Sequence, residues 1–143
     1  MLMATVFNTG LPATGTLTLQ CCGRCRQVNY PPRELCGNCL ADELHWQPVA
    51  DGGVVQSLTQ LNYSLEPEYH RHLPWAIASV VLDCGPVALV HLAPGIAIGA
   101  RVTVRVIRDQ ASNRMLLATD MNTQSQQAVS DWLQTVQFEE IQA

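Results

Sequence analysis

Four cysteines between residues 21 and 39 form two pairs, and each pair has a two-residue gap. The pairs are Cys22–Cys25 and Cys36–Cys39, separated by ten residues. A two-residue gap lets both thiolates turn toward one ion, and two such pairs complete a tetrahedral set of four sulfurs. Because four sulfurs leave no open position for water or substrate, the pattern predicts one structural zinc per chain. Iron in a rubredoxin-like site and disulfides are the alternatives.

Cys21 stands directly before Cys22 and is the spare cysteine of this cluster. Only Cys22 has the two-residue gap to Cys25, so register excludes Cys21 from the predicted metal site. A segment of about thirty residues cannot build a sufficient apolar core, and we expect metal binding to supply the missing free energy of folding. The sequence therefore predicts a zinc ribbon over residues 20–48, preceded by an arm over residues 1–19 whose alternating end, Thr16–Leu19, suits a short strand entering the ribbon.

A proline-rich strap, Tyr30-Pro31-Pro32-Arg33, lies between the two cysteine pairs. Each proline fixes its own φ and disfavours the helical region for the preceding residue, so we expect an extended segment that presents Tyr30 and Arg33. Two interpretations of Arg33 remain open. It forms a local cap or ion pair, or it contacts an anionic ligand or partner.

The charge balance limits the classes of partner. The chain has eight arginines and no lysine against twelve acidic residues, for a net charge of −4. Affinity for phosphates comes from accumulated basic charge, so we expect neither broad nucleic-acid binding nor binding to anionic membranes. We find no signal-peptide pattern and no apolar run of membrane-spanning length. We therefore expect a cytoplasmic protein, where clustered cysteines favour metal over disulfides.

Residues 49–121 contain five stretches with the character of β-strands, and the protein is predicted to be mainly β. The stretches are residues 54–60, 75–82, 87–92, 101–107 and 115–119. Turn residues 83–86 join the second and third stretches into a hairpin, and glycines 52 and 53 suit a turn or bulge before the first. Five strands too short to bury a face alone predict a small OB-type barrel. The segment 93–100 is too short and too glycine-rich for a helix.

The fourth stretch and the C-terminal segment show clear periodicity. Val102, Val104 and Val106 alternate with polar residues and are expected to point inward. In residues 122–143, an apolar stripe predicts an amphipathic helix, with Ser125 or Ser130 as N-cap. The stripe consists of Val129, Trp132, Leu133 and Val136. This helix packs on its own barrel, or it docks on a partner with Trp132 as the anchor.

The combination of ribbon, strap and barrel resembles the family called domain of unknown function thirty-five, acyl-CoA-associated OB-fold proteins with an N-terminal rubredoxin-like zinc ribbon. The resemblance covers about residues 17–119. It rests on Cys22, Cys25, Cys36, Cys39, Tyr30-Pro31-Pro32-Arg33, Trp46, Gly53-Val54-Val55, Ser57-Leu58-Thr59, Pro74, Val80-Val81-Leu82-Asp83, Gly85, Ile98-Gly99 and Val102-Thr103-Val104. The family usually has glycine after the second cysteine of each pair, where this chain has Arg26 and Leu40, so we expect local differences in the two turns.

The resemblance implies a non-catalytic accessory subunit. Such a subunit binds acyl-CoA or scaffolds a thiolase-like, ketoacyl-synthase-like or acyl-CoA hydratase enzyme, and no catalytic activity of its own is expected. The sequence agrees, because it shows no nucleophile elbow, no phosphate-binding glycine loop and no open metal site. A nucleic-acid-binding ribbon and OB module, and an iron-binding electron carrier, are the alternative functions.

The loop between the first and second predicted strands collects residues that suit ligand or partner binding. They are Tyr63, His70, Arg71 and His72, followed by Trp75 at the start of the next strand. In OB folds this loop borders the usual ligand face. Two interpretations remain: Arg71 and the histidines contact CoA phosphates or an acidic partner surface, or the loop is solvated and its tyrosines pack against the barrel.

Overall fold

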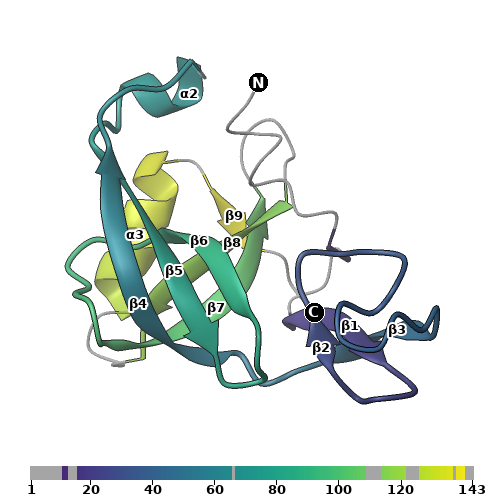
Figure 1. The fold of residues 1–143 in the computed structure, drawn as a ribbon. Coiled ribbons are helices and arrows are strands. Elements are labelled where there is room, and N and C mark those ends of the chain that lie inside the picture. Colours follow the sequence, from purple (N-terminus) through teal and green to yellow (C-terminus); the bar gives the residue numbers. More distant parts are fainter. Residues whose placement is uncertain are drawn as a thin grey trace.

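The chain folds into two β-sheets (Figure 1). The computed structural model describes residues 11–12, 16–65, 67–108, 114–121, 126–136 and 138–140. One sheet has three strands in the order β2-β1-β3, and the other has six in the order β4-β5-β6-β8-β7-β9. The elements are β1 Thr18–Cys22, β2 Val28–Asn29, β3 Leu44–Pro48, β4 Gly52–Leu61, α2 Pro67–His70, β5 Trp75–Leu82, β6 Val87–Leu92, β7 Arg101–Arg108, β8 Arg114–Asp120, α3 Gln126–Val136 and β9 Glu139–Glu140.

The larger sheet closes into a five-stranded barrel. Strand β4 pairs with β5 along its length and also with β7, where Gly53 lies opposite Val102. Strands β6 and β8 run parallel, with His91 opposite Leu117, and all other pairs in this sheet are antiparallel. The order β4-β5-β6-β8-β7 with one parallel pair is that of an OB barrel, which confirms the predicted fold class. Strand β9 extends the sheet beyond β7.

The predicted barrel strands match the observed ones to within one residue, except at the start of β4. Val102, Val104 and Val106 are at most 2% exposed and face the core, as their alternation predicts. Strand β4 begins at Gly52, so both glycines belong to the strand and not to the turn that the sequence suggested. A Cβ on Gly53 would lie 2.6 Å from Val80 Cγ1 and 2.8 Å from the Val81 carbonyl oxygen. Only glycine allows β4 to approach β5 so closely here.

The hairpin of β5 and β6 turns at Asp83–Pro86, as predicted. Leu82 N donates to Pro86 O, and Gly85 has a φ of 126°, a value that glycine adopts without strain. After β6 the chain turns at Pro94 and Gly95 and reaches β7 without a helix, so the prediction for residues 93–100 is correct.

The ribbon and the barrel share part of one apolar core. Leu17 and Leu19, at the start of the ribbon sheet, are at most 2% exposed and belong to the same cluster as barrel residues such as Val80 and Leu116. Val49 N also donates to Leu17 O across the junction. Strand β1 thus begins inside the segment that was expected to be an arm. The rest of that segment lies mainly outside the described residues.

Helix α3 packs on the barrel, so the intramolecular interpretation is the one observed. Leu133 and Val136 are each 4% exposed and share a cluster with Ile107 and Leu117 of the barrel. The helix begins at Gln126, so Ser130 lies inside it, and Ser125 falls outside the described residues. No helix in the described ranges is long and apolar enough to cross a membrane.

Candidate metal centre and apolar pocket

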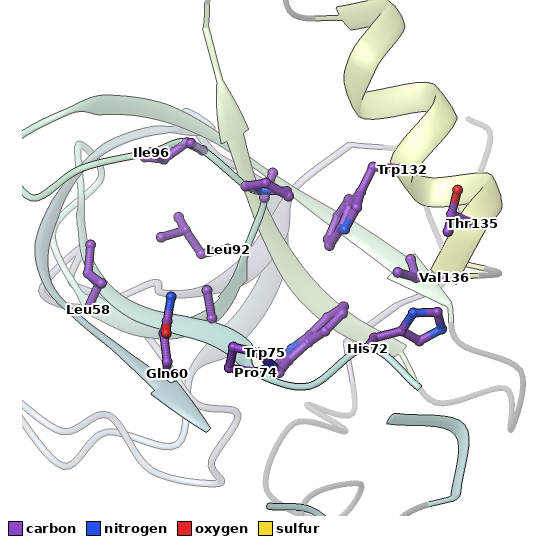
Figure 2. A pocket seen from close by; sticks show the side chains of 14 residues that line it. Leu58, Gln60, His72, Pro74, Trp75, Leu92, Ile96, Trp132, Thr135 and Val136 are labelled. Carbon is purple, nitrogen blue, oxygen red and sulfur yellow. The ribbon is translucent and has the colours of Figure 1, made fainter. Parts of the chain in front are cut away.

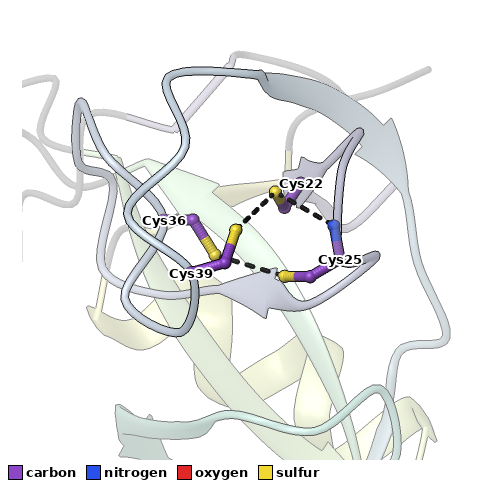
Figure 3. Close-up of side chains that lie close together, drawn as sticks. All are labelled: Cys22, Cys25, Cys36 and Cys39. Carbon is purple, nitrogen blue, oxygen red and sulfur yellow. Dashed lines mark hydrogen bonds between the residues drawn. The ribbon is translucent and has the colours of Figure 1, made fainter.

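The four paired cysteines converge on one point (Figure 3). Their Sγ atoms all lie within 4.8 Å of one another, with Cys22 and Cys39 3.6 Å apart and Cys25 and Cys36 also 3.6 Å apart. A tetrahedral zinc with Zn–S bonds of 2.3 Å places its sulfurs about 3.8 Å apart, whereas a disulfide needs about 2.05 Å. All six cysteines are free. The sulfur arrangement therefore fits one tetrahedral zinc.

Backbone amides of each turn point at the sulfurs. Arg24 N and Cys25 N lie 3.4 and 3.5 Å from Cys22 Sγ, and Asn38 N lies 3.4 Å from Cys36 Sγ. The pKa of Cys36 is lowered to about 6, first by the backbone N–H of Cys39 and then by other donors around the sulfur. A thiolate near neutral pH is the form that binds metal. The turn of the second cysteine pair thus favours the thiolate form of Cys36.

Asn29 is a supporting residue that the sequence analysis missed. Its side chain is 6% exposed, and its Nδ2 donates to Cys36 Sγ at 3.6 Å and to Gln27 O at 3.1 Å. Its Oδ1 accepts from Gly37 N at 2.8 Å. Asn29 therefore ties β2 to the second cysteine pair and orients one ligand. A polar residue beside a proline strap has no ligand signature, so the sequence offers no signal for this role.

A pocket opens between one end of the barrel and helix α3 (Figure 2). Its volume is about 340 Å³, within the range of small-molecule sites. Strands β4 and β5, the turn after β6 and one side of α3 supply its walls. The lining residues are Leu58, Gln60, His72, Pro74, Trp75, Ala76, Leu92, Ala93, Pro94, Gly95, Ile96, Trp132, Thr135 and Val136.

An aromatic cluster forms the wall between the pocket and the core. Trp75 is 3% exposed, stacks on Trp132 with centroids 5.5 Å apart, and meets Phe138 edge to face at 5.5 Å. Trp75 Nε1 donates to His91 Nδ1 at 2.7 Å. Because Nδ1 accepts this bond, His91 is neutral with its proton on Nε2. Complete burial lowers the pKa of His91 to about 3, in agreement with that form.

Comparisons with known proteins assign the two domains. The family model for the ChsH2 rubredoxin-like zinc ribbon domain matches residues 10–45, and that for the ChsH2 C-terminal OB-fold domain matches residues 46–106. The chain belongs to the ChsH2 (DUF35) family. The ribbon accordingly holds one structural zinc, as the cysteine spacing predicted.

Two solved structures that are similar to this chain carry the DUF35 name in their descriptions. One is described as an Ltp2-ChsH2(DUF35) aldolase, with a TM-score of 0.60 and 23% identity, covering 72% of this chain and 83% of that chain. Another is a DUF35 protein of unknown function from Sulfolobus solfataricus, with a TM-score of 0.46 and 15% identity, covering 71% and 75%. No curated protein matches the chain. The first likeness supports the ribbon and barrel fold.

The turns of the two cysteine pairs keep one conformation although this ChsH2-family chain lacks the expected glycines. Arg26 and Leu40, each just after a second cysteine, have positive φ values of 67° and 62°. Arg26 N donates to Cys22 O and Leu40 N to Cys36 O, so the two turns close alike. The two turns therefore have the same conformation, and two residues with side chains occupy the left-handed region that glycine favours.

Replacing Leu40 with glycine is expected to stabilise the zinc-bound ribbon. Its side chain is 72% exposed, so the variant loses little packing and relieves the left-handed strain. The net gain is at most about 1 kcal/mol, because glycine also loses more entropy on folding. The thermal midpoint of the zinc-bound protein measures the effect. Leu35→Gly is the control, since Leu35 is exposed and has no positive φ. Equal losses in both variants would contradict the prediction.

The strap differs from the straight extended segment that the prolines predicted. The Tyr30–Pro31 peptide is cis, and the chain bends at these two residues. Gln20 holds the strap at its far end, because its side chain donates to Arg33 O and accepts from Arg33 N. Arg33 lies against the second cysteine pair, since a Cβ on Gly37 would be 2.5 Å from Arg33 Nη1. Tyr30 is partly buried against the barrel core, and this burial raises its pKa to about 12.

The structure gathers three of the predicted binding residues and separates the others. His72, Trp75 and Trp132 line the pocket, and the sequence analysis grouped His72 with Trp75 but not with Trp132. Tyr63, His70 and Arg71 are exposed and lie outside the pocket lining. The His70 ring Nε2 donates to the Ser64 carbonyl oxygen, which ties the loop to itself. Arg33 is at a separate site within the ribbon, beside the second cysteine pair.

Proposed function

We propose that this ChsH2-family chain is a non-catalytic accessory subunit of an acyl-CoA enzyme. It binds acyl-CoA or scaffolds an enzyme of the thiolase-like, ketoacyl-synthase-like or acyl-CoA hydratase type. The observation that carries the proposal is the family's pairing of a closed four-sulfur site with an OB barrel. Four sulfur ligands leave the ion no position for a substrate, so zinc stabilises the fold and the chemistry belongs to a partner. The solved relative described as an Ltp2-ChsH2(DUF35) aldolase supports an enzyme partner.

An exposed apolar patch on the β5–β6 hairpin supports a protein partner. Val81, Val87 and Leu89, here called the hairpin patch, are 37%, 49% and 42% exposed. Val81 lies opposite Val87, and alternation places Leu89 on the same outer face of the barrel. Contiguous exposed aliphatic side chains mark interaction surfaces in soluble proteins. We assign the hairpin patch to the contact with the enzyme subunit.

Coexpression with the products of the neighbouring genes tests the proposal. We expect the tagged chain to copurify in defined stoichiometry with one of them. An acyl-CoA ester should also bind to the chain or to the complex in calorimetry. Persistent monomeric behaviour beside every such neighbour, together with no binding of CoA esters, would refute the accessory role.

A lysine in the hairpin patch is expected to disrupt the complex. Val87→Lys and Leu89→Lys each place a charge in an apolar contact, and we expect the partner's affinity to fall by about tenfold or more. Ile98→Lys is the matched control, because Ile98 is 62% exposed and lies on the segment between β6 and β7, outside the β5–β6 hairpin. Copurified partner per chain is the measurement. An equal loss in the control, or no loss in the patch variants, would remove the patch from the interface.

A further inference from the structure

The pocket beside α3 is lined by apolar and uncharged groups. Figure 2 shows Leu58, Leu92 and Ile96 across the pocket from Trp132 and Val136. Leu92 is 3% exposed and Val136 4% exposed, so both belong to the packed core as well as to the pocket wall. The described lining contains no arginine, aspartate or glutamate, and His72 is its one titratable residue. This chemistry suits an uncharged ligand with both an apolar part and a hydrogen-bonding group.

The same lining excludes the phosphate end of a CoA ester. Phosphate groups require accumulated basic side chains or clustered backbone N–H donors, and Arg71 lies outside the pocket lining. Burying a phosphate against Trp132 and Ile96 without a cation would carry a large desolvation penalty. The polar side chains available in the pocket are Gln60, Thr135 and His72, which suit one or two hydrogen bonds to a neutral group.

The aromatic wall of the pocket is held in place from behind. Trp75 stacks on Trp132 and is itself fixed by its hydrogen bond to His91 and by the edge of Phe138. A wall fixed in this way loses little conformational freedom when a ligand binds. Its stacked rings offer an apolar surface to a flat or branched hydrocarbon group. The pocket volume of about 340 Å³ accommodates a short acyl chain or a single ring system.

We propose that this pocket binds the acyl end of an acyl thioester, with Trp75, Trp132 and Ile96 as its apolar walls. The identity of the ligand as a thioester rests on the proposed function, whereas its neutral and apolar character rests on the pocket itself. Trp132 thereby contacts the hydrocarbon part of the ligand, and His72 is placed to hydrogen-bond a neutral group. This arrangement replaces the expected contact of His72 with CoA phosphates. Helix α3 then forms part of a binding site and also packs on its own barrel.

Calorimetry of the full chain with the neutral N-acetylcysteamine thioester of hexanoate tests this proposal, with free CoA as the comparison. We expect the neutral thioester to bind although it has no phosphate. Thr135→Phe places a ring at the pocket, and Ile96→Glu places a charge there; each should weaken binding by about tenfold or more. Thr135 is exposed, so Thr135→Phe does not disturb the core of the barrel.

Two neighbouring positions provide matched controls. Gln134→Phe adds the same ring to α3, and Ile98→Glu adds the same charge near β7. Gln134 and Ile98 both lie outside the pocket lining. We expect both to bind the thioester within about twofold of the unchanged chain. Equal binding by Thr135→Phe, Ile96→Glu and the controls, or no binding of the thioester to the unchanged chain, would overturn the proposal.

Copurification of the same variants with the enzyme partner separates the two proposals. If all variants still copurify with the enzyme partner and the pocket substitutions do not change thioester affinity, the pocket proposal is wrong and the accessory role stands. If thioester binding depends on the pocket and no partner copurifies, the pocket proposal stands and the accessory role is wrong.

Discussion

Replacing Cys36 with serine is expected to release the zinc and unfold the ribbon. The ribbon's own core consists of the buried residues Cys22, Cys36 and Ala41. The other two ligands, Cys25 and Cys39, and Leu44 pack against it, so the metal ligands form most of this core. Zinc contributes about 10–16 kcal/mol of folding free energy in small domains of this kind. Losing one of four ligands removes most of that contribution. The barrel should remain folded but less stable, because Leu17 and Leu19 complete its core.

Zinc content per chain and amide hydrogen exchange measure this loss. Cys36→Ser should contain far less than one zinc per chain, and its ribbon amides should exchange rapidly while the barrel stays protected. Cys21→Ser is the matched control and should keep one zinc, because Cys21 lies outside the sulfur cluster. Full zinc in Cys36→Ser, or its loss in Cys21→Ser, would show that the ligand assignment is wrong. A coloured protein containing iron would favour the electron-carrier alternative.

Acid is expected to destabilise the barrel through His91. The ring is completely buried, and its pKa falls from 6.5 to about 3 because burial disfavours the charged form. Below pH 6.5 the unfolded chain binds a proton at this ring and the folded chain does not, so stability is lost as the pH falls from about 6.5 toward 3. Integrated over that window, the loss is about 4–5 kcal/mol, of which about 1.4 kcal/mol appears between pH 7.5 and 5.5.

His91→Asn isolates this contribution. The Asn side-chain oxygen accepts a hydrogen bond from Trp75 Nε1 without titrating in this range. Urea unfolding at pH 7.5 and 5.5, followed by tryptophan fluorescence, should show that the unchanged protein loses about 1.4 kcal/mol more than the variant. Any effect of pH on the zinc site is common to both proteins and cancels in the comparison. Equal losses in the two proteins would show that His91 does not titrate on unfolding.

Local patterns predict the metal site and most of the barrel. The spacing of Cys22, Cys25, Cys36 and Cys39 is enough to identify the ligands, because a metal turn is a short-range structure. The bounds of β5 and β6 follow from two apolar runs and the turn at residues 83–86, which also form locally. The inward valines of β7 follow from the two-residue period of a strand.

Features that depend on contacts between distant segments were not predictable. Position 53 of β4 requires glycine because Val80 and Val81 of β5 lie so close to it. No local sequence pattern reveals that approach. Strand β9 consists of Glu139 and Glu140, which form a short antiparallel ladder with Arg108 and Ile107 at the end of β7. The strand exists because the chain after α3 returns to that edge.

In the candidate sites, too, the groups that distant segments bring together were not predictable from the sequence. His72, Trp75 and Trp132 meet only because α3 packs beside the start of β5, so the pocket could not be found before the fold was known. Likewise, the role of Asn29 depends on the second cysteine pair folding back over β2. Sequence reasoning therefore finds ligands that are close in the chain and misses groups that the tertiary structure brings together.

Steady-state turnover of an acyl-CoA substrate tests the accessory role most directly. The assay compares the copurified enzyme alone, this chain alone and the reconstituted complex under the same conditions. We expect no turnover by this chain alone and faster turnover by the complex than by the enzyme alone. Turnover by the isolated chain, or equal turnover by the enzyme with and without it, would contradict a non-catalytic subunit that supports an acyl-CoA enzyme.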